Sequence, residues 1–172
     1  LYYFGYYPTS TIHLILDDRP LAANGLATVF PQNTIRLYLY PPVSRSHLAG
    51  GADYLKRLVL HELVHVIHMD QTRGVLDIGR TLFGSIAKLG GVVPRWFSEG
   101  LATWAESHFT KGGRLRNELL EWELQSRLVD PKFCQSIDCL NEPNGNPHGS
   151  YAYWAGAHFL GWLEQKRAGT LR

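Results

Sequence analysis

The hydrophobic pattern of this chain changes once, from strand-type in residues 1–43 to helix-type in the remainder. Residues 11–16 are predicted to form a buried strand, and residues 34–40 an alternating one. A shorter strand at 24–30 opens with an Asn-Gly turn dipeptide. Strands followed by helices favour an α+β fold, here a small N-terminal mixed sheet followed by a mostly helical C-terminal lobe.

Apolar residues recur at three- and four-residue spacing in several later segments, which predicts helices. The second of these segments is mostly apolar but is interrupted by glycines, so it is compatible with two short helices. A loop rich in Pro, Asn and Gly at 130–149 precedes the last helix. The helix-type segments are 53–69, 74–94, 96–108, 114–129 and 151–167.

Composition narrows the class of protein. The 172 residues carry a net charge of +2, with 19% charged and 12% aromatic residues, which argues against a nucleic-acid-binding surface and against disorder. No run of apolar residues is long enough to predict a membrane-spanning helix. The length fits one domain, 1–172, divided into 1–70 and 71–172. Because the chain starts at Leu1 and ends without an obvious stop, we expect it to be excised from a longer protein with additional domains.

The sequence His61-Glu62-Leu63-Val64-His65 is an H-E-x-x-H motif inside the predicted helix 53–69. Residues i and i+4 are neighbours on one helix face, so the two imidazoles can bind one zinc ion. Glu62 lies beside them and can reach a water on that ion without being a ligand. The alternative is that both histidines are ordinary packing or surface residues and the match is accidental.

A catalytic zinc site usually has a third protein ligand. His68 follows His65 by three residues, but His61 to His68 along one helix spans about 10 Å, which is long for one tetrahedral ion. The other candidate is Glu99, in the sequence Trp-Phe-Ser-Glu-Gly of the next predicted helix. Its apolar neighbours argue against the alternative of a freely solvated carboxylate.

H-E-x-x-H followed by W-x-x-E-G-x-A-x-x-x-E resembles the gluzincin metallopeptidases, the group of thermolysin and aminopeptidase N. The wider pattern is similar to a bacterial peptidase family of that clan whose members are often attached to larger envelope proteins. The resemblance covers residues 20–168 and implies a gluzincin-like catalytic domain. It implies His61, His65 and Glu99 as zinc ligands and Glu62 as general base. The segments that carry it are 24–27, 58–65, 94–100 and 153–159.

The chain departs from those relatives in two respects. Residues 66–98 separate His65 from Glu99, whereas the linker of thermolysin and aminopeptidase N is much shorter. No G-x-M-E-N motif is present, so aminopeptidase specificity does not carry over. The corresponding place, before a strand, is held by Asn24, Gly25, Leu26 and Ala27, which we expect to bind an extended substrate at an exposed sheet edge.

Three further residues are candidates for supporting roles. A ligating histidine usually donates its other N–H to a carboxylate or carbonyl, and Glu106 or Asp70 could accept it; exposed helix carboxylates are the alternative. A tyrosine hydroxyl near the metal would stabilise the oxyanion. Tyr153 is the preferred candidate, with Tyr151 and His148 as alternatives.

These features predict a zinc-dependent peptidase acting on a peptide or protein substrate, either an endopeptidase or an enzyme of restricted specificity. A catalytically silent gluzincin-like binding or assembly module is the alternative. The 74–94 segment would cover the domain or contact a membrane or partner domain. Cys134 and Cys139 could form a disulfide or remain free thiols. The placement of these two cysteines in the loop at 130–149 and the family resemblance predict an extracytoplasmic location, the bacterial periplasm or cell envelope.

Overall fold

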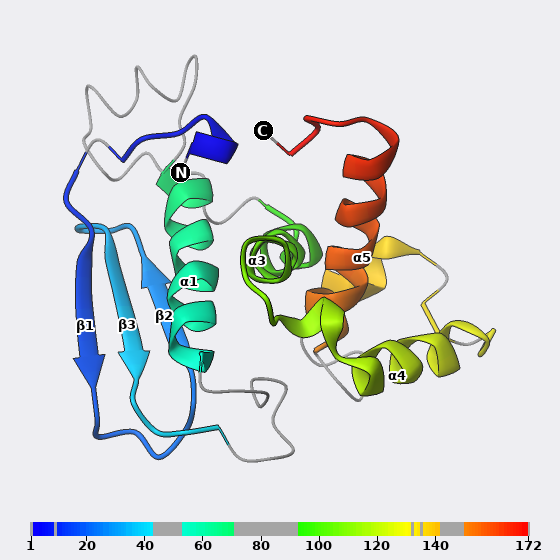
Figure 1. Ribbon diagram of the computed structural model, residues 1–172, viewed down its shortest axis with the longest axis horizontal. Coiled ribbons are helices and arrows are strands. Elements are labelled where there is room, and N and C mark those ends of the chain that lie inside the picture. Colours follow the sequence, from blue (N-terminus) through cyan, green and yellow to red (C-terminus); the bar gives the residue numbers. More distant parts are fainter. Residues whose placement is uncertain are drawn as a thin grey trace. The chain divides into compact units, whose positions relative to one another are not determined.

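The computed structural model describes residues 2–8, 10–42, 53–70, 93–131, 133–134, 136–141 and 150–171. The chain divides into two compact units, Leu1–Val93 and Pro94–Leu171. The positions of the two units relative to one another are not determined (Figure 1). The predicted segment 74–94 lies almost entirely outside the described residues.

The first unit contains a three-stranded mixed sheet in the order β1-β3-β2. β1 (His13–Asp17) runs parallel to β3 (Thr34–Tyr38), and β2 (Gly25–Thr28) runs antiparallel to β3 on its other side. A short 3₁₀ helix, η1 (Tyr2–Phe4), precedes the sheet. The three predicted strands are confirmed, each with ends shifted by up to two residues.

Helix α1 (Tyr54–Asp70) packs against β2 and β3, as Figure 1 shows, and confirms the helix predicted at 53–69. Alternate residues of β3 are buried because they face this helix, while those between are only partly covered. β1 lies beyond the helix and remains largely exposed. The core of this unit consists of Val29, Ile35, Leu37, Leu58 and Val66.

The second unit is helical. It contains α3 (Arg95–Phe109), α4 (Glu118–Leu128) and α5 (Tyr151–Lys166), which confirm the predicted helices. The segment predicted as one helix at 114–129 begins instead with a 3₁₀ turn, η3 (Arg114–Arg116). The Asn117 side chain then caps α4 by accepting hydrogen bonds from the N–H groups of Leu119 and Leu120. A side-chain cap of this kind fixes where a helix starts.

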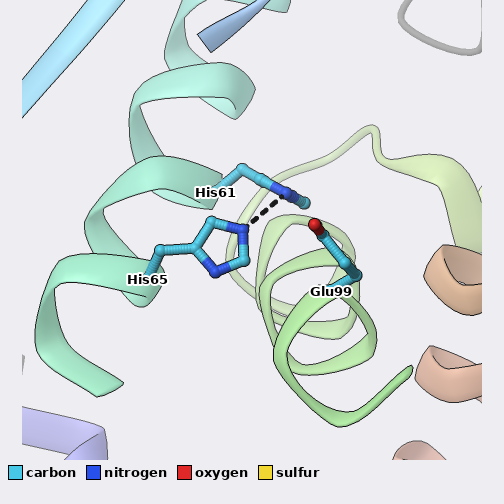
Figure 2. Close-up of side chains that lie close together, drawn as sticks. All are labelled: His61, His65 and Glu99. Atoms are coloured by element: carbon cyan, nitrogen blue, oxygen red, sulfur yellow. Dashed lines mark hydrogen bonds between the residues drawn. The ribbon is translucent and has the colours of Figure 1, made fainter. Parts of the chain in front are cut away.

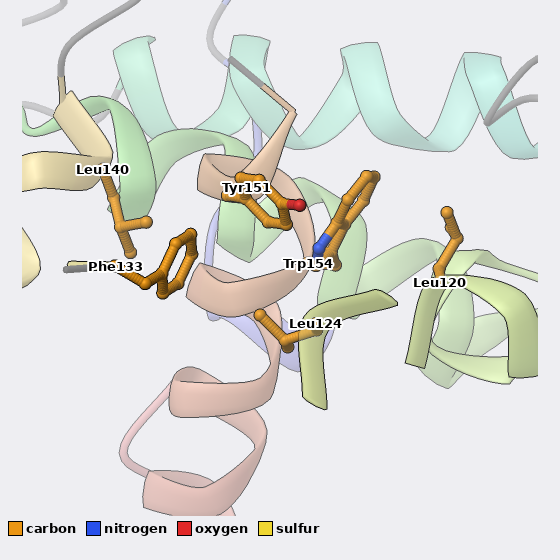
Figure 3. Close-up of a cluster of buried hydrophobic side chains, with 6 residues drawn as sticks. All are labelled: Leu120, Leu124, Phe133, Leu140, Tyr151 and Trp154. Carbon is orange, nitrogen blue, oxygen red and sulfur yellow. The ribbon is translucent and has the colours of Figure 1, made fainter. Parts of the chain in front are cut away.

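An aromatic and aliphatic core joins α4, α5 and the loop between them (Figure 3). The loop contains a second 3₁₀ helix, η4 (Ile137–Asn141), and the disulfide Cys134–Cys139, whose Cα atoms lie 5.6 Å apart. Phe133 precedes the bridge and packs edge-on against the Tyr151 ring. The core side chains are Leu120, Leu124, Phe133, Leu140, Tyr151 and Trp154.

Helices α3 and α5 contact each other through glycines. A Cβ atom added at Gly156 would lie 2.2 Å from the Trp96 carbonyl oxygen, and one added at Gly100 would lie 2.6 Å from the Gly156 carbonyl carbon. Only residues without a side chain allow two helix backbones to come this close. The glycine of the W-x-x-E-G motif therefore serves helix packing.

The described residues thus form an α+β structure, with a small mixed sheet and four α-helices. This confirms the predicted α+β class, while the gluzincin-like catalytic domain stays a prediction. None of the described helices is long and apolar enough to cross a membrane.

Candidate metal centre

The two histidines of the H-E-x-x-H motif lie one turn apart on α1 and point their Nε2 atoms at each other, 3.2 Å apart (Figure 2). Their rings meet nearly at right angles, at 81°, with centroids 4.8 Å apart. His61 is buried and His65 is partly buried. The helix has therefore brought both imidazoles to one point, as the i, i+4 spacing predicts.

This geometry fits a shared metal ion. Zinc–nitrogen bonds of 2.0–2.1 Å at a tetrahedral angle place two ligand nitrogens about 3.3 Å apart. The observed separation of 3.2 Å agrees with that value. It also allows a direct hydrogen bond, in which one ring donates and the other accepts. The two rings can thus share either a hydrogen bond or a metal ion. Imidazole nitrogens are ligand atoms that suit zinc.

Glu62 is buried at 5% exposure and lies against β2. A Cβ atom added at Gly25 would come within 2.6 Å of its Oε1 and within 2.7 Å of its Cγ. The missing side chain at Gly25 thus makes room for the carboxylate beside the strand. The sequence predicted Gly25 to bind an extended substrate, and the structure adds a contact with the predicted general base.

Asp70 ends α1 and is fully buried. Its Oδ2 accepts hydrogen bonds from the Tyr6 hydroxyl and from the Asn33 side-chain amide, the latter at 3.2 Å. Asn33 is also fully buried and donates to Ser10. These bonds tie the end of the histidine-bearing helix to the N-terminal segment and to the residue before β3. The role predicted for Asp70, orienting a ligating histidine, stays a prediction.

Glu99, the third predicted ligand, lies on α3 in the second unit and is partly buried. Figure 2 draws it with the two α1 histidines, and these three residues are the His/His/Glu set in the described part of the chain that could hold a metal ion. His68 is not in this set. Burial lowers the pKa of the His68 imidazole and the neighbouring His65 lowers it further.

Tyr153 lies in the same unit as Glu99, one turn before Gly156 on α5. Burial raises the pKa of its phenol, the negative charge of Glu99 raises it further, and Arg114 and Arg95 oppose the rise. The phenol therefore keeps its proton at neutral pH and can act as a hydrogen-bond donor. The contact between α3 and α5 at Gly156 brings the carboxylate and the phenol into each other's electrostatic range.

The two alternatives to Tyr153 are placed differently. Tyr151 is 1% exposed in the helical core, where its hydroxyl donates to Glu123 at 3.0 Å and accepts from Arg127 at 3.1 Å. Burial and the bond to Glu123 raise the pKa of this phenol too. His148 lies outside the described residues. The electrostatic neighbours of Tyr153 include a predicted zinc ligand, Glu99.

Glu106 is 2% exposed, and its Oε1 accepts a 2.7 Å ion-pairing hydrogen bond from Nε of Arg114, which is also buried. The Arg114 guanidinium also lies over the Tyr153 ring, 4.7 Å from its centroid. The alternative of an exposed, solvated Glu106 is therefore wrong. Its predicted bond to a ligating histidine stays a prediction.

Sequence reasoning missed the two arginines around Tyr153. Arg114 follows Glu106, the last glutamate of the motif, by eight residues, and nothing in its local pattern marks it as buried. Arg95 directly precedes the Trp-x-x-Glu-Gly segment, so its position at the start of α3 was the available signal. The contacts of Arg114 with Glu106 and Tyr153 became visible only with α3, η3 and α5 packed together.

Comparison with protein-family models, with curated proteins and with solved structures finds no match to this chain. The similarity to gluzincins therefore stays a prediction from the motifs and from the geometry of the residues that carry them.

Proposed function

We propose that this chain is a zinc-dependent peptidase of the gluzincin type, with His61, His65 and Glu99 as the metal ligands. The observation that carries the proposal is the pair of imidazole Nε2 atoms 3.2 Å apart on α1, with a buried carboxylate, Glu62, next to them in the chain. The proposal requires the second unit to bring Glu99 to the same ion.

Zinc held by these residues would lower the pKa of a water molecule and polarise the peptide carbonyl. Glu62 would accept the proton of the attacking water and later deliver it to the leaving amine. Its place against Gly25 limits the positions that the carboxylate can adopt, because the strand backbone lies on one side of it. A fixed carboxylate is what efficient proton transfer needs.

Tyr153 would donate its hydroxyl hydrogen to the substrate oxygen on which negative charge develops. Two features support this role. Its pKa is raised by burial and by Glu99, so the proton is present at neutral pH. Arg95 and Arg114 lie over its ring, at 5.5 and 4.7 Å from the centroid, and hold it in place.

The substrate would bind as an extended strand along β2. β2 is an edge strand of the described sheet, and β3 pairs with one of its two edges. Leu26 is half exposed and Gly25 contacts Glu62, so an added strand would run past the general base. Adding a peptide strand to a sheet edge supplies main-chain hydrogen bonds that do not depend on sequence.

We also propose that the domain works outside the cytoplasm, in the bacterial periplasm or cell envelope, as part of a longer protein. The Cys134–Cys139 disulfide supports this, because such bonds persist in oxidising compartments. The apolar 74–94 segment would either pack on the domain or contact a membrane or partner domain.

Metal analysis and peptide turnover test the proposal. Purified protein should contain one zinc per chain, and Glu99→Ala should lose most of it, whereas Glu118→Ala, at an exposed helix carboxylate, should keep it. Glu62→Gln should keep zinc and fold but lose hydrolysis by a factor of roughly 10² to 10⁴.

Three results would count against it. Full zinc retention in Glu99→Ala with loss in His68→Ala would move the third ligand to His68. Near-normal turnover by Glu62→Gln would remove the general base. Stoichiometric zinc without hydrolysis of any peptide in a diverse library would favour the silent binding module.

A further inference from the structure

The strand β1 lies at one edge of the described sheet, with β3 between it and β2 (Figure 1). Its three central residues are large, apolar and exposed: Leu14 at 54%, Ile15 at 38% and Leu16 at 59%. Successive side chains of a strand point to opposite faces, so the two leucines share one face of the sheet and Ile15 lies on the other. A strand that is apolar on both faces is typical of the middle of a sheet, where both faces are covered. The sequence of β1 therefore does not match its place at an edge.

The outer edge of β1 carries none of the usual features that keep edge strands from pairing. Proteins commonly place Lys or Pro in such a strand, shorten it or interrupt it with a bulge. Residues 13–17 contain neither Lys nor Pro, and all five pair with β3 in an unbroken register. In the part of the chain that the structure describes, no strand pairs with the outer edge. β1 is therefore open to pairing with one more strand.

The main-chain groups of β1 show which residues an added strand would bond to. The His13 N–H donates to the Asn33 carbonyl oxygen at 2.8 Å, and the Asp17 carbonyl oxygen accepts a 2.9 Å bond from the residue after β3. Odd-numbered residues thus bond to β3, because alternate peptide groups of a strand point to opposite edges. The main-chain N–H and C=O groups of Leu14 and Leu16 consequently point to the outer edge.

The sequence of β1 is complementary to itself in one antiparallel register. If two copies pair about Ile15, Leu14 of each copy lies opposite Leu16 of the other, so that outward main-chain groups meet each other. His13 then lies opposite Asp17, and like charges do not face each other. A two-fold axis through Ile15 generates this arrangement, and two-fold dimers are the commonest homo-oligomers. Self-complementarity therefore favours a second copy of this chain as the occupant of the edge.

We propose that the outer edge of β1 is a dimerisation surface, at which two copies of this chain pair through antiparallel β1 strands. The pairing joins two three-stranded sheets into one continuous sheet. It brings the exposed leucines of both copies together on the face where α1 packs, since their register partners Ile35 and Leu37 belong to the core beneath that helix. Burial of this apolar surface stabilises the dimer. The opposite edge, at β2, stays open, and the inference is independent of the proposed peptidase function.

Sedimentation equilibrium of the purified chain tests the association. The average mass should rise with concentration from one chain to two, with a Kd in the micromolar range. It should stop there, because pairing uses the outer edge of both copies. A chain that stays monomeric up to about 1 mM would overturn the proposal and leave the edge to a strand from outside this chain.

Charged substitutions assign the association to β1. Leu14→Lys combined with Leu16→Lys gathers the ammonium groups of both copies at the two-fold axis and should raise the Kd at least about tenfold. Leu128→Lys, at a 63% exposed leucine of α4, adds positive charge outside β1 and should leave the Kd unchanged. Equal Kd values for the parent and the double variant, or a rise of the same size in Leu128→Lys, would overturn the proposal.

Cysteine cross-linking tests the register and does not require the charged variant to fold. In the register centred on Ile15, this residue faces its own copy in a non-hydrogen-bonded pair with Cα atoms about 4.5 Å apart, which suits a disulfide. Ile15→Cys should therefore form covalent dimers under mild oxidation. His13→Cys is the matched control, because the two His13 positions lie four residues out of register, about 14 Å apart. The native cysteines do not interfere, since Cys134 and Cys139 are bonded to each other. Cross-linking of neither variant, or of both equally, would overturn the proposal.

Discussion

Both units contain a place where glycine permits a close approach, and the approaching group differs between the two places. In the first unit a side chain, Glu62, lies against Gly25 of an edge strand. In the second unit two helix backbones meet at Gly100 and Gly156. A displaced side chain can rotate away, whereas a backbone cannot. Glycine therefore supports the candidate chemistry in the first unit and the packing of the fold in the second.

The two units also differ in how completely their side chains are buried. In the first unit, Leu14 of β1 is 54% exposed, whereas its partner Ile35 on β3 is 3% exposed. Likewise, Leu16 is 59% exposed and its partner Leu37 is 1% exposed. Helix α1 covers β3 and leaves β1 outside. In the second unit Trp154, the largest of the fully buried side chains, is 1% exposed. Substitutions should consequently cost more stability in the second unit.

The largest expected effect on stability is at the buried ion pair of the second unit. Arg114→Met leaves the Glu106 carboxylate buried without its cation, which should destabilise this unit by about 3–5 kcal/mol. Chemical denaturation followed by tryptophan fluorescence would measure it. Adding Glu106→Gln to Arg114→Met should recover much of the loss, and Arg116→Met should change stability little. A loss below 1 kcal/mol in Arg114→Met would show that the pair does not hold the unit together.

The contact between α3 and α5 comes next. Gly156→Ala places a Cβ atom 2.2 Å from the Trp96 carbonyl oxygen, so the helices must separate. We expect a loss of roughly 2–3 kcal/mol from this overpacking. Gly161→Ala on the same helix meets only the Trp104 ring, at 3.3 Å, and should be near neutral because alanine favours helices. Equal thermal stability of the two variants would contradict the backbone contact.

Much of the fold and of the candidate site could be predicted from the sequence. The three strands and the helices that carry His61, Glu99 and Tyr153 follow from local periodicity, which reports the side of an element that is buried. The convergence of the two histidines follows from i, i+4 geometry alone. Asn117 shows the limit, because its capping role ended a helical pattern that appeared continuous over 114–129.

Contacts between distant segments could not be predicted in this way. The burial of Arg114 depends on η3 folding back onto Glu106, eight residues earlier. The burial of Asp70 depends on Tyr6 and Asn33, which are 64 and 37 residues away in sequence. Charged side chains in a helical pattern normally indicate a solvated face, so the pattern itself gave no sign of these partners.

The disulfide should have a smaller effect. The ring between Cys134 and Cys139 is short, so reduction should cost on the order of 2 kcal/mol by loop entropy. Phe133 and Leu140, on either side of the bridge, pack into the core that includes Tyr151. Reduction should loosen this loop and lower turnover while zinc content stays the same. Loss of zinc on reduction would show that the loop supports the metal ligands directly.

The smallest effect on stability, and the sharpest test of the comparison, is expected at Gly25. The three atoms nearest to the methyl group of Gly25→Ala would all belong to the Glu62 side chain, which can rotate, and alanine loses less backbone entropy than glycine. We expect a change in unfolding free energy below about 1 kcal/mol. Turnover should nevertheless fall, because the carboxylate moves from its place beside the strand.

A double-mutant cycle distinguishes this displacement from a direct effect of Gly25 on substrate binding. If Gly25 acts through Glu62, then Gly25→Ala lowers kcat in the parent protein and changes it little in Glu62→Gln, since coupled residues are not additive. Additive losses, or a rise in KM with kcat unchanged, would instead assign Gly25 to the substrate strand alone. The first outcome would make the glycine of the sheet a part of the catalytic arrangement. The glycines between α3 and α5 differ, because their replacement should lower the stability of the unit.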